Sequence, residues 1–349
     1  MNNKINLVLA SDKNYIKLLV PCIVSILYNK KPTTEIDIYI LQSGINDYHQ
    51  QKIKELERFN NITNCKIKFI NTDEHKLFKN LAIERLETRK RYSSFVLYKL
   101  FVPKLFSNLD KILHIDIDTI IRCDLLDFYN QDLKDNYCAA IKYNAENYIE
   151  TEQNYNGELV KVRDILTEIG LPNNVNYFVQ GGVILFNIKQ IILDNKQVKL
   201  ESYGVQYKDI LGIIDESVLT ATFLDRVSYI ETLYNFNTLT VDYFNSHLNK
   251  EEQQEFLKSL KQAKIFHYIN QVKPNRLSRL NKIFPLAYRE FYKYYQMSYL
   301  RINPIKLQLT FLFASLKRFR CSMFGAKNTQ GGKKVFYFLG LEFVVRKGN

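Results

Sequence analysis

The sequence predicts an α/β protein with a mostly parallel β-sheet flanked by helices, followed by a basic, helical C-terminal appendage. Strand-like and helical runs alternate from the N-terminus, which is the pattern of βαβ units. With 349 residues, 46% of them hydrophobic, the chain can bury one large core. Residues 273–349 hold sixteen of the 49 basic residues but two of the 36 acidic ones. We therefore expect a domain over residues 1–275 and an appendage over residues 276–349.

The predicted elements follow one another in a regular order. The first part reads strand 5–10, helix 15–29, strand 35–41, helix 47–59, strand 65–71 and helical segments to about residue 106. Further strands are expected at 112–125, 136–143, 177–188, 226–232 and 263–269, with an Asn-rich insertion at 144–176. In open sheets of this kind ligands bind beyond the carboxyl ends of the strands, so functional residues are expected there.

Cysteine usage and the N-terminal sequence favour a cytoplasmic protein. The five cysteines are irregularly spaced and form no Cys-x-x-Cys pair, which argues against a disulfide framework or a zinc site and for a reducing compartment. The apolar stretch near the N-terminus is too short for a signal peptide or a membrane span.

Two carboxylates stand in an apolar run, residues 112–125, that otherwise predicts a buried strand. Desolvating an ionised carboxylate is costly, so a buried one is normally paired or neutralised. Because residues two apart on a strand share a face, Asp116 and Asp118 should point the same way at its carboxyl end, with Ile117 turned into the core. His114 lies further back on that face and is expected to be structural. A divalent cation would supply the missing charge; the alternative is that the pair caps loop amides.

Five blocks of sequence occur in the order found in one enzyme family. They are residues 7–15, 91–125, 177–187, 214–219 and 265–276. The second block, RYSSFVLYKLFVPKLFSNLDKILHIDIDTIIRCDL, resembles the central block of glycosyltransferase family 8, retaining nucleotide-sugar transferases with a GT-A fold that include bacterial lipopolysaccharide galactosyl- and glucosyltransferases. The resemblance implies transfer of a hexose from a UDP-sugar to a glycan acceptor, such as lipopolysaccharide, lipooligosaccharide or another cell-surface glycan.

The first block, LVLASDKNY, resembles the turn that holds the uridine in this family. The resemblance implies that Ala10 and Asp12 contact the uracil and ribose, with Ser11 in the same turn. It also implies that Asn14 supports the loop and that Tyr15 stacks on the base, as an aromatic ring can. The alternative is an ordinary helix capped by Asp12.

Two further blocks resemble donor-sugar sites. Lys99 stands where the family commonly has arginine, which implies a contact with the donor sugar or its phosphates; the alternative is a solvated helix face. Gln180 takes the place of the family's amide and would bond sugar hydroxyls. Gly181 and Gly182 would let the ligand approach the backbone, although two glycines in a strand can instead mark a bulge or tight packing.

The block IDESVL stands where family members usually read Asp-Gln-Asp. The resemblance implies that Asp215 binds donor hydroxyls and that Glu216 takes the place of the glutamine beneath the anomeric carbon. Glutamate there could stabilise a developing cation by its charge or attack as a nucleophile, or both acids could simply start a helix. An aspartate that contacts galactose in one branch aligns near Tyr143, so the donor sugar stays open.

The last block, IFHYINQVKPNR, resembles the family's His-Tyr-x-Gly-x-x-Lys-Pro pattern. The resemblance implies that His267 joins Asp116 and Asp118 as a ligand of Mn2+ or Mg2+, that Ile117 between them lines the donor site, and that Lys273 reaches the diphosphate. The alternative is a core histidine.

Two hypotheses of different classes follow. The first is a metal-dependent hexosyltransferase with Glu216, Asp215 and Gln180 in the catalytic centre. The second is a nucleotide-sugar-binding subunit that has lost catalysis, which Glu216 and Asn270, in place of the family's glutamine and glycine, permit. A glycoside hydrolase is disfavoured because neighbours on one strand cannot readily flank a glycosidic bond.

The C-terminal appendage combines basic and aromatic residues. Its segment 305–319 has too few apolar residues to span a bilayer. Basic residues among aromatic ones suit an anionic membrane surface, and family members that act on lipid-linked glycans have a comparable C-terminus. We expect a peripheral protein on the cytoplasmic face of a bacterial inner membrane, with a lipid-linked acceptor. The alternatives are a helical hairpin packed on the core and nucleic acid, which we do not expect as a partner.

Overall fold

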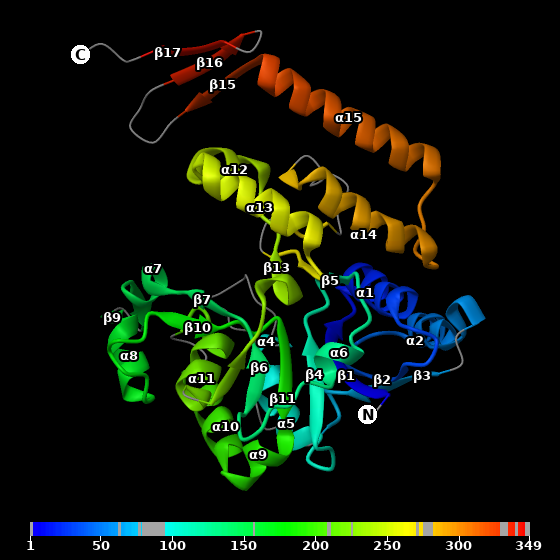
Figure 1. Cartoon of the computed structure of the whole chain (residues 1–349), viewed down its shortest axis with the longest axis vertical. Helices are drawn as coiled ribbons and strands as arrows, with labels where there is room; N and C mark the ends of the chain where they lie inside the picture. Colours follow the sequence, from blue (N-terminus) through cyan, green and yellow to red (C-terminus); the bar gives the residue numbers. More distant parts are fainter. Residues whose placement is uncertain are drawn as a thin grey trace.

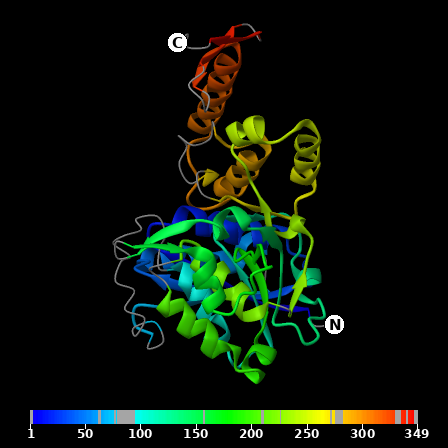
Figure 2. The same ribbon diagram turned by 90° about the vertical axis from the view of Figure 1, so that its left-hand side faces the viewer.

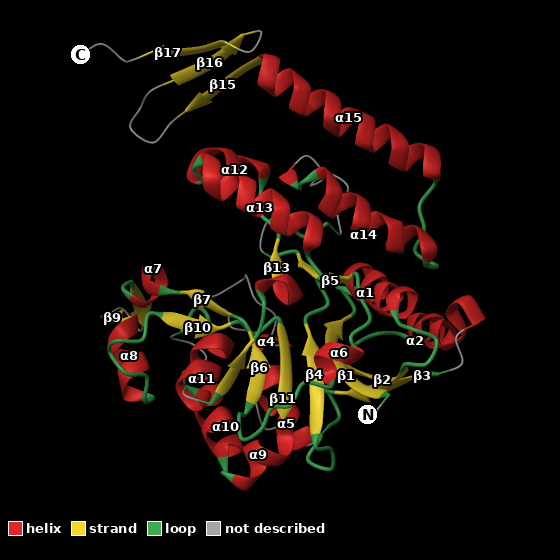
Figure 3. Ribbon diagram, in the orientation of Figure 1, coloured by secondary structure: helices red, strands yellow, loops and turns green. Residues whose placement is uncertain are grey.

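The computed structural model describes residues 3–61, 64–75, 78, 95–155, 158–207, 211–224, 226–269, 272–274, 282–328, 334–338 and 341–345. Its centre is a seven-stranded sheet in the order β12-β6-β11-β4-β1-β2-β3 (Figures 1 and 3). The strands are β1 (Lys4–Asp12), β2 (Glu35–Ser43), β3 (Cys65–Asn71), β4 (Lys111–Ile115), β6 (Cys138–Ala140), β11 (Val183–Asn187) and β12 (Val227–Tyr229). Neighbours are parallel except that β11 runs antiparallel to β4 and β6. The predicted mostly parallel sheet with flanking helices is confirmed.

Alternation along the strands sends side chains to two cores, one on each face of the sheet. Leu7 and Leu9 lie in the core shared with α1 (Ile16–Asn29), whereas Val8 between them lies in the opposite core. The opposite core is covered by α4 (Phe95–Tyr98), η2 (Lys99–Phe101), α5 (Val102–Leu105), α9 (Ile188–Leu193), α10 (Lys196–Gln206) and α11 (Ile214–Phe223). The predicted helix 47–59 consists of α2 (Asp47–Lys54) and the 3-10 helix η1 (Glu55–Asn61). Asn46 caps α2 by accepting a hydrogen bond from the N–H of His49 at 3.0 Å.

The predicted strand over residues 112–125 is interrupted, which corrects the sequence interpretation. β4 ends at Ile115, and a separate strand, β5 (Thr119–Ile121), begins after a bend. β5 belongs to a second sheet with β14 (Ile265–His267) and β13 (Phe236–Asn237). The chain therefore changes sheets at the two aspartates, because an uninterrupted strand would have to bury both carboxylates within one sheet.

Two other predicted strands are also interrupted. Residues 136–143 form β6 and then β7 (Lys142–Asn144), and residues 177–188 form β10 (Tyr177–Val179) and then β11. β7 and β10 pair antiparallel with each other outside the main sheet. The predicted insertion contains α7 (Glu146–Ile149), β8 (Glu152–Tyr155), β9 (Glu158–Lys161) and α8 (Val162–Glu168).

The C-terminal part begins as helices on the outside of α1. α14 (Pro285–Met297) packs against α1, and the amide of Asn29 donates to the hydroxyl of Tyr294 at 2.8 Å. α15 (Pro304–Met323) lies further from the sheet, and the two views place it at the top of the molecule (Figures 1 and 2). The helices α12 (Val241–His247) and α13 (Lys250–Gln262) lie between the sheet and α15.

The appendage is not entirely helical, which differs from the prediction. Beyond α15, the strands β15 (Phe324–Asn328), β16 (Lys334–Phe338) and β17 (Leu341–Val345) form an antiparallel sheet. Their sequences are rich in Phe, Tyr and Val, the residue types that favour strands. Across the described part of the chain, no helix combines the length and the apolar character that crossing a bilayer requires. The division at residue 275 stays a prediction.

Candidate active site

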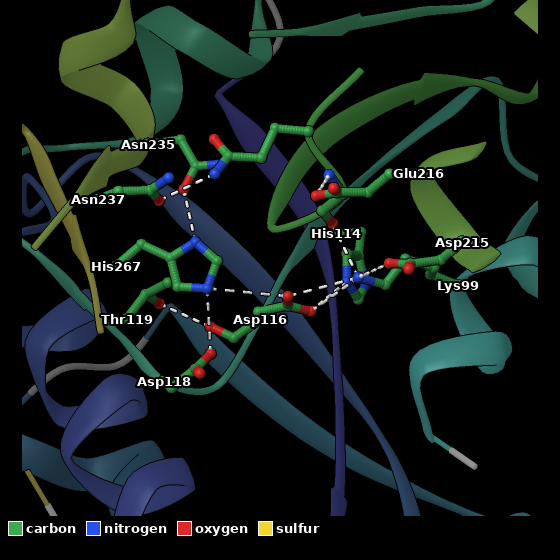
Figure 4. A network of polar contacts seen from close by, with 12 residues as sticks. Lys99, His114, Asp116, Asp118, Thr119, Asp215, Glu216, Asn235, Asn237 and His267 are labelled. Carbon is green, nitrogen blue, oxygen red and sulfur yellow. Dashed lines mark hydrogen bonds and ion pairs between the residues drawn. The ribbon is translucent and has the colours of Figure 1, made fainter. Parts of the chain in front are cut away.

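The predicted carboxylates lie where the chain passes from one sheet to the other. The N–H of Asp116, directly after β4, donates to the carbonyl of Gly182 at 2.8 Å. The carbonyl of Asp118, directly before β5, accepts from the N–H of Tyr268 at 2.8 Å, which joins this turn to the strand carrying His267. Figure 4 places Asp116, Asp118 and His267 side by side. The interruption of the predicted strand thus brings together groups distant in sequence.

Three potential metal ligands converge at this point. His267 Nε2 lies 3.3 Å from Asp118 Oδ1 and 3.9 Å from Asp116 Oδ2, and one ligand atom of each residue lies within 4.8 Å of the others. His267 and Asp118 are buried, whereas the Asp116 side chain is 30% exposed. Two carboxylates and an imidazole suit a divalent cation such as Mn2+, so this donor set fits the predicted metal.

Asn235 orients His267, a role that the sequence analysis missed. Asn235 Oδ1 lies 2.9 Å from His267 Nδ1, and both side chains are buried. Because an amide oxygen can only accept, Nδ1 is the donor in this bond, and Nε2 is the ring nitrogen that faces the carboxylates. Asn235 ends a short 3-10 helix, η3 (Thr232–Asn235). A lone asparagine in such a turn belongs to no motif, so the sequence contains no signal for this contact.

The two glycines are packed tightly against protein side chains. A Cβ on Gly182 would lie 2.3 Å from His267 Cε1 and 2.6 Å from Nδ1. A Cβ on Gly181 would lie 2.8 Å from Asp215 Oδ2 and 3.0 Å from Lys99 Nζ. Of the interpretations made from the sequence, tight packing accounts for both glycines; approach of a ligand to the backbone stays a prediction.

Lys99 is a buried cation between two acids. Its side chain is 4% exposed, so the alternative of a solvated helix face is wrong. Lys99 Nζ lies 3.3 Å from Asp116 Oδ1 and 2.9 Å from Asp215 Oδ2, and it donates to the carbonyl of Gly181 at 3.1 Å (Figure 4). Burial opposes its charge, but Asp116 and Asp215 outweigh burial and raise the pKa of Lys99 above its ordinary value. Lys99 therefore holds the two acids together.

Lys273 forms an ion pair with the second aspartate. Its Nζ lies 2.7 Å from Asp118 Oδ2 and 5.9 Å from the centre of the Tyr15 ring. Burial opposes ionisation of Asp118, but the positive charge of Lys273 and the hydrogen bond with His267 outweigh burial and lower the pKa of Asp118 to about 2. The block at residues 265–276 and the first block therefore meet beside the carboxylates.

His114 and Gln180 complete the surroundings. His114 Nε2 lies 3.0 Å from Asp116 Oδ1, so this histidine, predicted to be structural, directly contacts a candidate ligand. Burial lowers the pKa of His114. The Gln180 amide donates to Asn237 Oδ1 at 2.9 Å, while its buried Oε1 has no hydrogen-bond partner among the described residues. A buried acceptor normally has a hydrogen-bond partner, which a ligand hydroxyl would supply here.

Glu216 lies at the start of α11, and both of its carboxylate oxygens accept a hydrogen bond. The N–H of Gly181 donates to Oε1 at 2.9 Å, and the hydroxyl of Tyr143 donates to Oε2. Burial and the neighbouring Asp215 raise the pKa of Glu216 to about 7. This contact between Tyr143 and Glu216 could not be read from the sequence, because the two residues are 73 positions apart.

The turn after β1 differs from the alternative considered for it. α1 begins at Ile16 after Tyr15, and no side chain caps it, so Asp12 is not its cap. Asp12 Oδ1 instead accepts from the N–H of Asn14 at 2.7 Å, and the Ser11 hydroxyl donates to the Asp12 carbonyl at 3.1 Å. Tyr15 packs partly buried against the core, as does Ile117, while Ala10 packs against the opposite core. Their contacts with a nucleotide stay predictions.

Comparisons with known proteins match most of the chain. Residues 6–276 match the family described as "Glycosyl transferase family 8". A Haemophilus influenzae protein whose name assigns it to the glycosyltransferases is 26% identical over 231 residues, covering 66% of this chain but 63% of that protein, less than two thirds of its length. The WbbM bifunctional glycosyltransferase has a TM-score of 0.69 at 20% identity, covering 89% of this chain and 52% of that one. The galactosyltransferase LgtC, solved with donor and acceptor sugar analogs, has a TM-score of 0.60 at 20% identity, covering 88% and 100%. Both likenesses establish the fold.

Proposed function

Because this chain belongs to glycosyltransferase family 8 and has a GT-A fold, we propose that it moves a hexose from a UDP-sugar to a glycan acceptor with retention at the anomeric carbon. The observation that carries the proposal is the meeting of Asp116, Asp118 and His267 beside Lys273 and Tyr15. The carboxylates can bind a metal ion, the ammonium can bind the diphosphate, and the aromatic ring can stack on the base of a nucleotide.

The metal would be held by Asp116, Asp118 and Nε2 of His267, with Mn2+ or Mg2+ as the ion. When bound, it would neutralise negative charge on the departing UDP. Lys273 would bind the diphosphate, adding a second positive charge where negative charge develops. Glu216 would face the positive charge that develops at the anomeric carbon, and Gln180 Oε1 would accept from a sugar hydroxyl.

The proposed transfer step needs no reactant besides the UDP-sugar and the acceptor hydroxyl. The bond between the anomeric carbon and the diphosphate oxygen breaks, and its electron pair leaves with UDP. The acceptor hydroxyl forms the new bond on the face that UDP vacates and gives its proton to the departing phosphate oxygen. Leaving and attacking groups then share one face, so the anomeric configuration is retained.

A panel of UDP-sugars tests the proposal. We expect one of them to release UDP in the presence of Mn2+, to lose that activity with a chelator, and to react faster when a glycan acceptor is added. Proton NMR of the product should give the anomeric configuration of the donor. Binding of UDP-sugars without any release of UDP would instead support the nucleotide-sugar-binding subunit.

Asn235 provides a test of the metal site that does not depend on activity. Replacing Asn235 with Leu should lower Mn2+ affinity about 10–100-fold, because the orienting acceptor for His267 Nδ1 is lost. Asn235→Asp keeps an acceptor and should retain most of the affinity. Calorimetric titration with Mn2+, in the absence of UDP-sugar, measures the affinity of both variants. If Asn235→Leu bound Mn2+ as tightly as the wild type, Asn235 would not be needed to orient His267.

We further propose a lipid-linked acceptor and peripheral attachment to the inner membrane through α15. On α15, Leu307 is buried and the Phe311 ring stacks on Tyr288 with centroids 5.0 Å apart. Large apolar side chains are nevertheless exposed elsewhere on the helix, namely Ile305, Leu309, Leu312, Phe313 and Leu316. The sequence continues into KRFR, so apolar and basic residues occur together in this segment. This combination is typical of segments that bind anionic membrane surfaces.

Flotation with liposomes tests the attachment. The full chain should float with vesicles containing anionic lipid at moderate salt, and Phe313→Asp should weaken that binding at least about tenfold by placing a charge in the apolar interface. Leu193→Asp is the matched control, because Leu193 is 72% exposed on α9, outside the C-terminal part. A wild-type protein that stays entirely at the bottom of the gradient would refute the attachment.

A further inference from the structure

Tyr143 contacts the candidate catalytic acid, Glu216, although the two residues are 73 positions apart. Tyr143 lies on β7, opposite Phe178 on β10, and its ring meets the Phe178 ring edge-on with centroids 6.3 Å apart. Anchored in this way, the Tyr143 hydroxyl donates to Glu216 Oε2. Since the N–H of Gly181 donates to Oε1, the carboxylate is held at both oxygens by groups from separate elements.

We propose that Tyr143 is a positioning residue for sugar transfer: with the amide of Gly181, its hydroxyl fixes Glu216 as a stationary negative charge instead of a free nucleophile. This inference rests on the proposed function. A carboxylate whose two oxygens each accept a hydrogen bond has less electron density to share and cannot turn toward a reacting carbon without breaking a bond. Glu216 would therefore stabilise the developing cation by charge, with no bond between them.

A tyrosine at position 143 suits the glutamate at position 216 better than an acid would. A tyrosine hydroxyl can donate to the second oxygen of a glutamate, whereas a carboxylate at position 143 would repel it. Among the described residues, the charged groups with the largest effect on the pKa of Glu216 are Asp215 on the same helix and Lys99 from η2. Burial and Glu216 raise the pKa of Tyr143, so the phenol stays protonated and remains a donor over the physiological pH range.

The proposal predicts how the ionisation of Glu216 responds to Tyr143. The Tyr143 bond favours the ionised form of Glu216, whose pKa is about 7. Tyr143→Phe removes the hydroxyl alone, so the pKa of Glu216 should rise by about one unit. If transfer requires the ionised acid, the rate of the wild type rises with pH through about 7. In Tyr143→Phe this rise should move to higher pH, and in Glu216→Gln it should be absent.

The experiment compares wild type, Tyr143→Phe, Glu216→Gln and the double variant, with Tyr177→Phe as the matched control. Tyr177 lies on the paired strand, its ring contacts Tyr229, and no hydrogen bond of its hydroxyl to described residues is seen. Carbon-13 NMR of the glutamate carboxyl groups, with the Glu216 signal identified by its loss in Glu216→Gln, gives the pKa without any turnover. The transfer rate is also measured as a function of pH. The mass of the intact protein after incubation with the UDP-sugar shows whether a hexosyl adduct has formed.

We expect Tyr143→Phe to raise the pKa of Glu216, to slow transfer about tenfold or more at neutral pH, and to add little in the Glu216→Gln background. Tyr177→Phe should change neither value, and the wild type should carry no hexosyl adduct. An unchanged pKa of Glu216 in Tyr143→Phe, or an adduct on Glu216 or Tyr143 in the wild type, would overturn the inference. If no UDP-sugar is turned over, the proposed function fails, whereas the NMR titration still decides whether Tyr143 controls Glu216.

Discussion

Sugar transfer is expected to fall at least about 1,000-fold when Asp118 is replaced by Asn, because stabilisation of a leaving group by a metal contributes several kcal/mol. Asparagine has nearly the same shape as aspartate, but it lacks the charge that pairs with Lys273 and the carboxylate that would bind the ion. Lys273 is about one third exposed, so its ammonium can turn to water in the variant and the fold should persist. UDP release and Mn2+-dependent binding of UDP should both be lost.

The control for this variant is Asp127→Asn, a nearby aspartate whose side chain is exposed. It should retain wild-type activity. Thermal melting of both variants separates loss of the site from loss of the fold. Full transfer activity in Asp118→Asn, with Mn2+ dependence unchanged, would show that Asp118 is not part of the metal site.

Replacing Gly182 with Ala should disable the same site by steric means. The added methyl would lie 2.3 Å from His267 Cε1, well inside the closest approach of two non-bonded carbon atoms, so the imidazole must move. Overpacking of this kind typically costs about 1–3 kcal/mol of stability. Moving His267 also breaks its bond to Asn235 and misplaces Nε2, so Mn2+ affinity should fall at least about tenfold.

A double variant identifies the source of the Gly182→Ala effect. In a His267→Ala background the ring is absent, so adding Gly182→Ala should cost little further stability in urea denaturation. Mn2+ affinity is expected to be lost already in that background, because one of the three metal ligands is absent. If Gly182→Ala destabilises both backgrounds equally, the cause lies in the backbone and not in the contact with His267.

Much of the architecture follows from local pattern. The apolar run at residues 5–10 predicted a strand, and the structure contains that strand, with Leu7 and Leu9 in one core and Val8 in the other. The ordered blocks also predicted that Asp116, Asp118 and His267 would approach one another, and they do. These features could be predicted because periodicity and family resemblance are both read directly from the order of residues along the chain.

The remaining features depend on partners that no local pattern identifies. The break of the predicted strand at Asp116 depends on β5 joining a different sheet, which is a tertiary event. Asn235 and Tyr143 each make a side-chain contact with a candidate site residue, across 32 and 73 positions of the chain. Their residue types are common in ordinary structural roles, so only the packed fold reveals what each one contacts.

Under the proposed function, the ion pair between Lys273 and Asp118 would make the binding of a divalent ion and of a diphosphate interdependent. The ammonium of Lys273 lies 2.7 Å from an oxygen of Asp118, a carboxylate that a divalent ion would need, so the ion would compete with Lys273 for it. A diphosphate would offer that ammonium a new partner and would thereby free the carboxylate. By thermodynamic linkage, UDP would then raise the affinity for the ion by the same factor as the ion would raise the affinity for UDP.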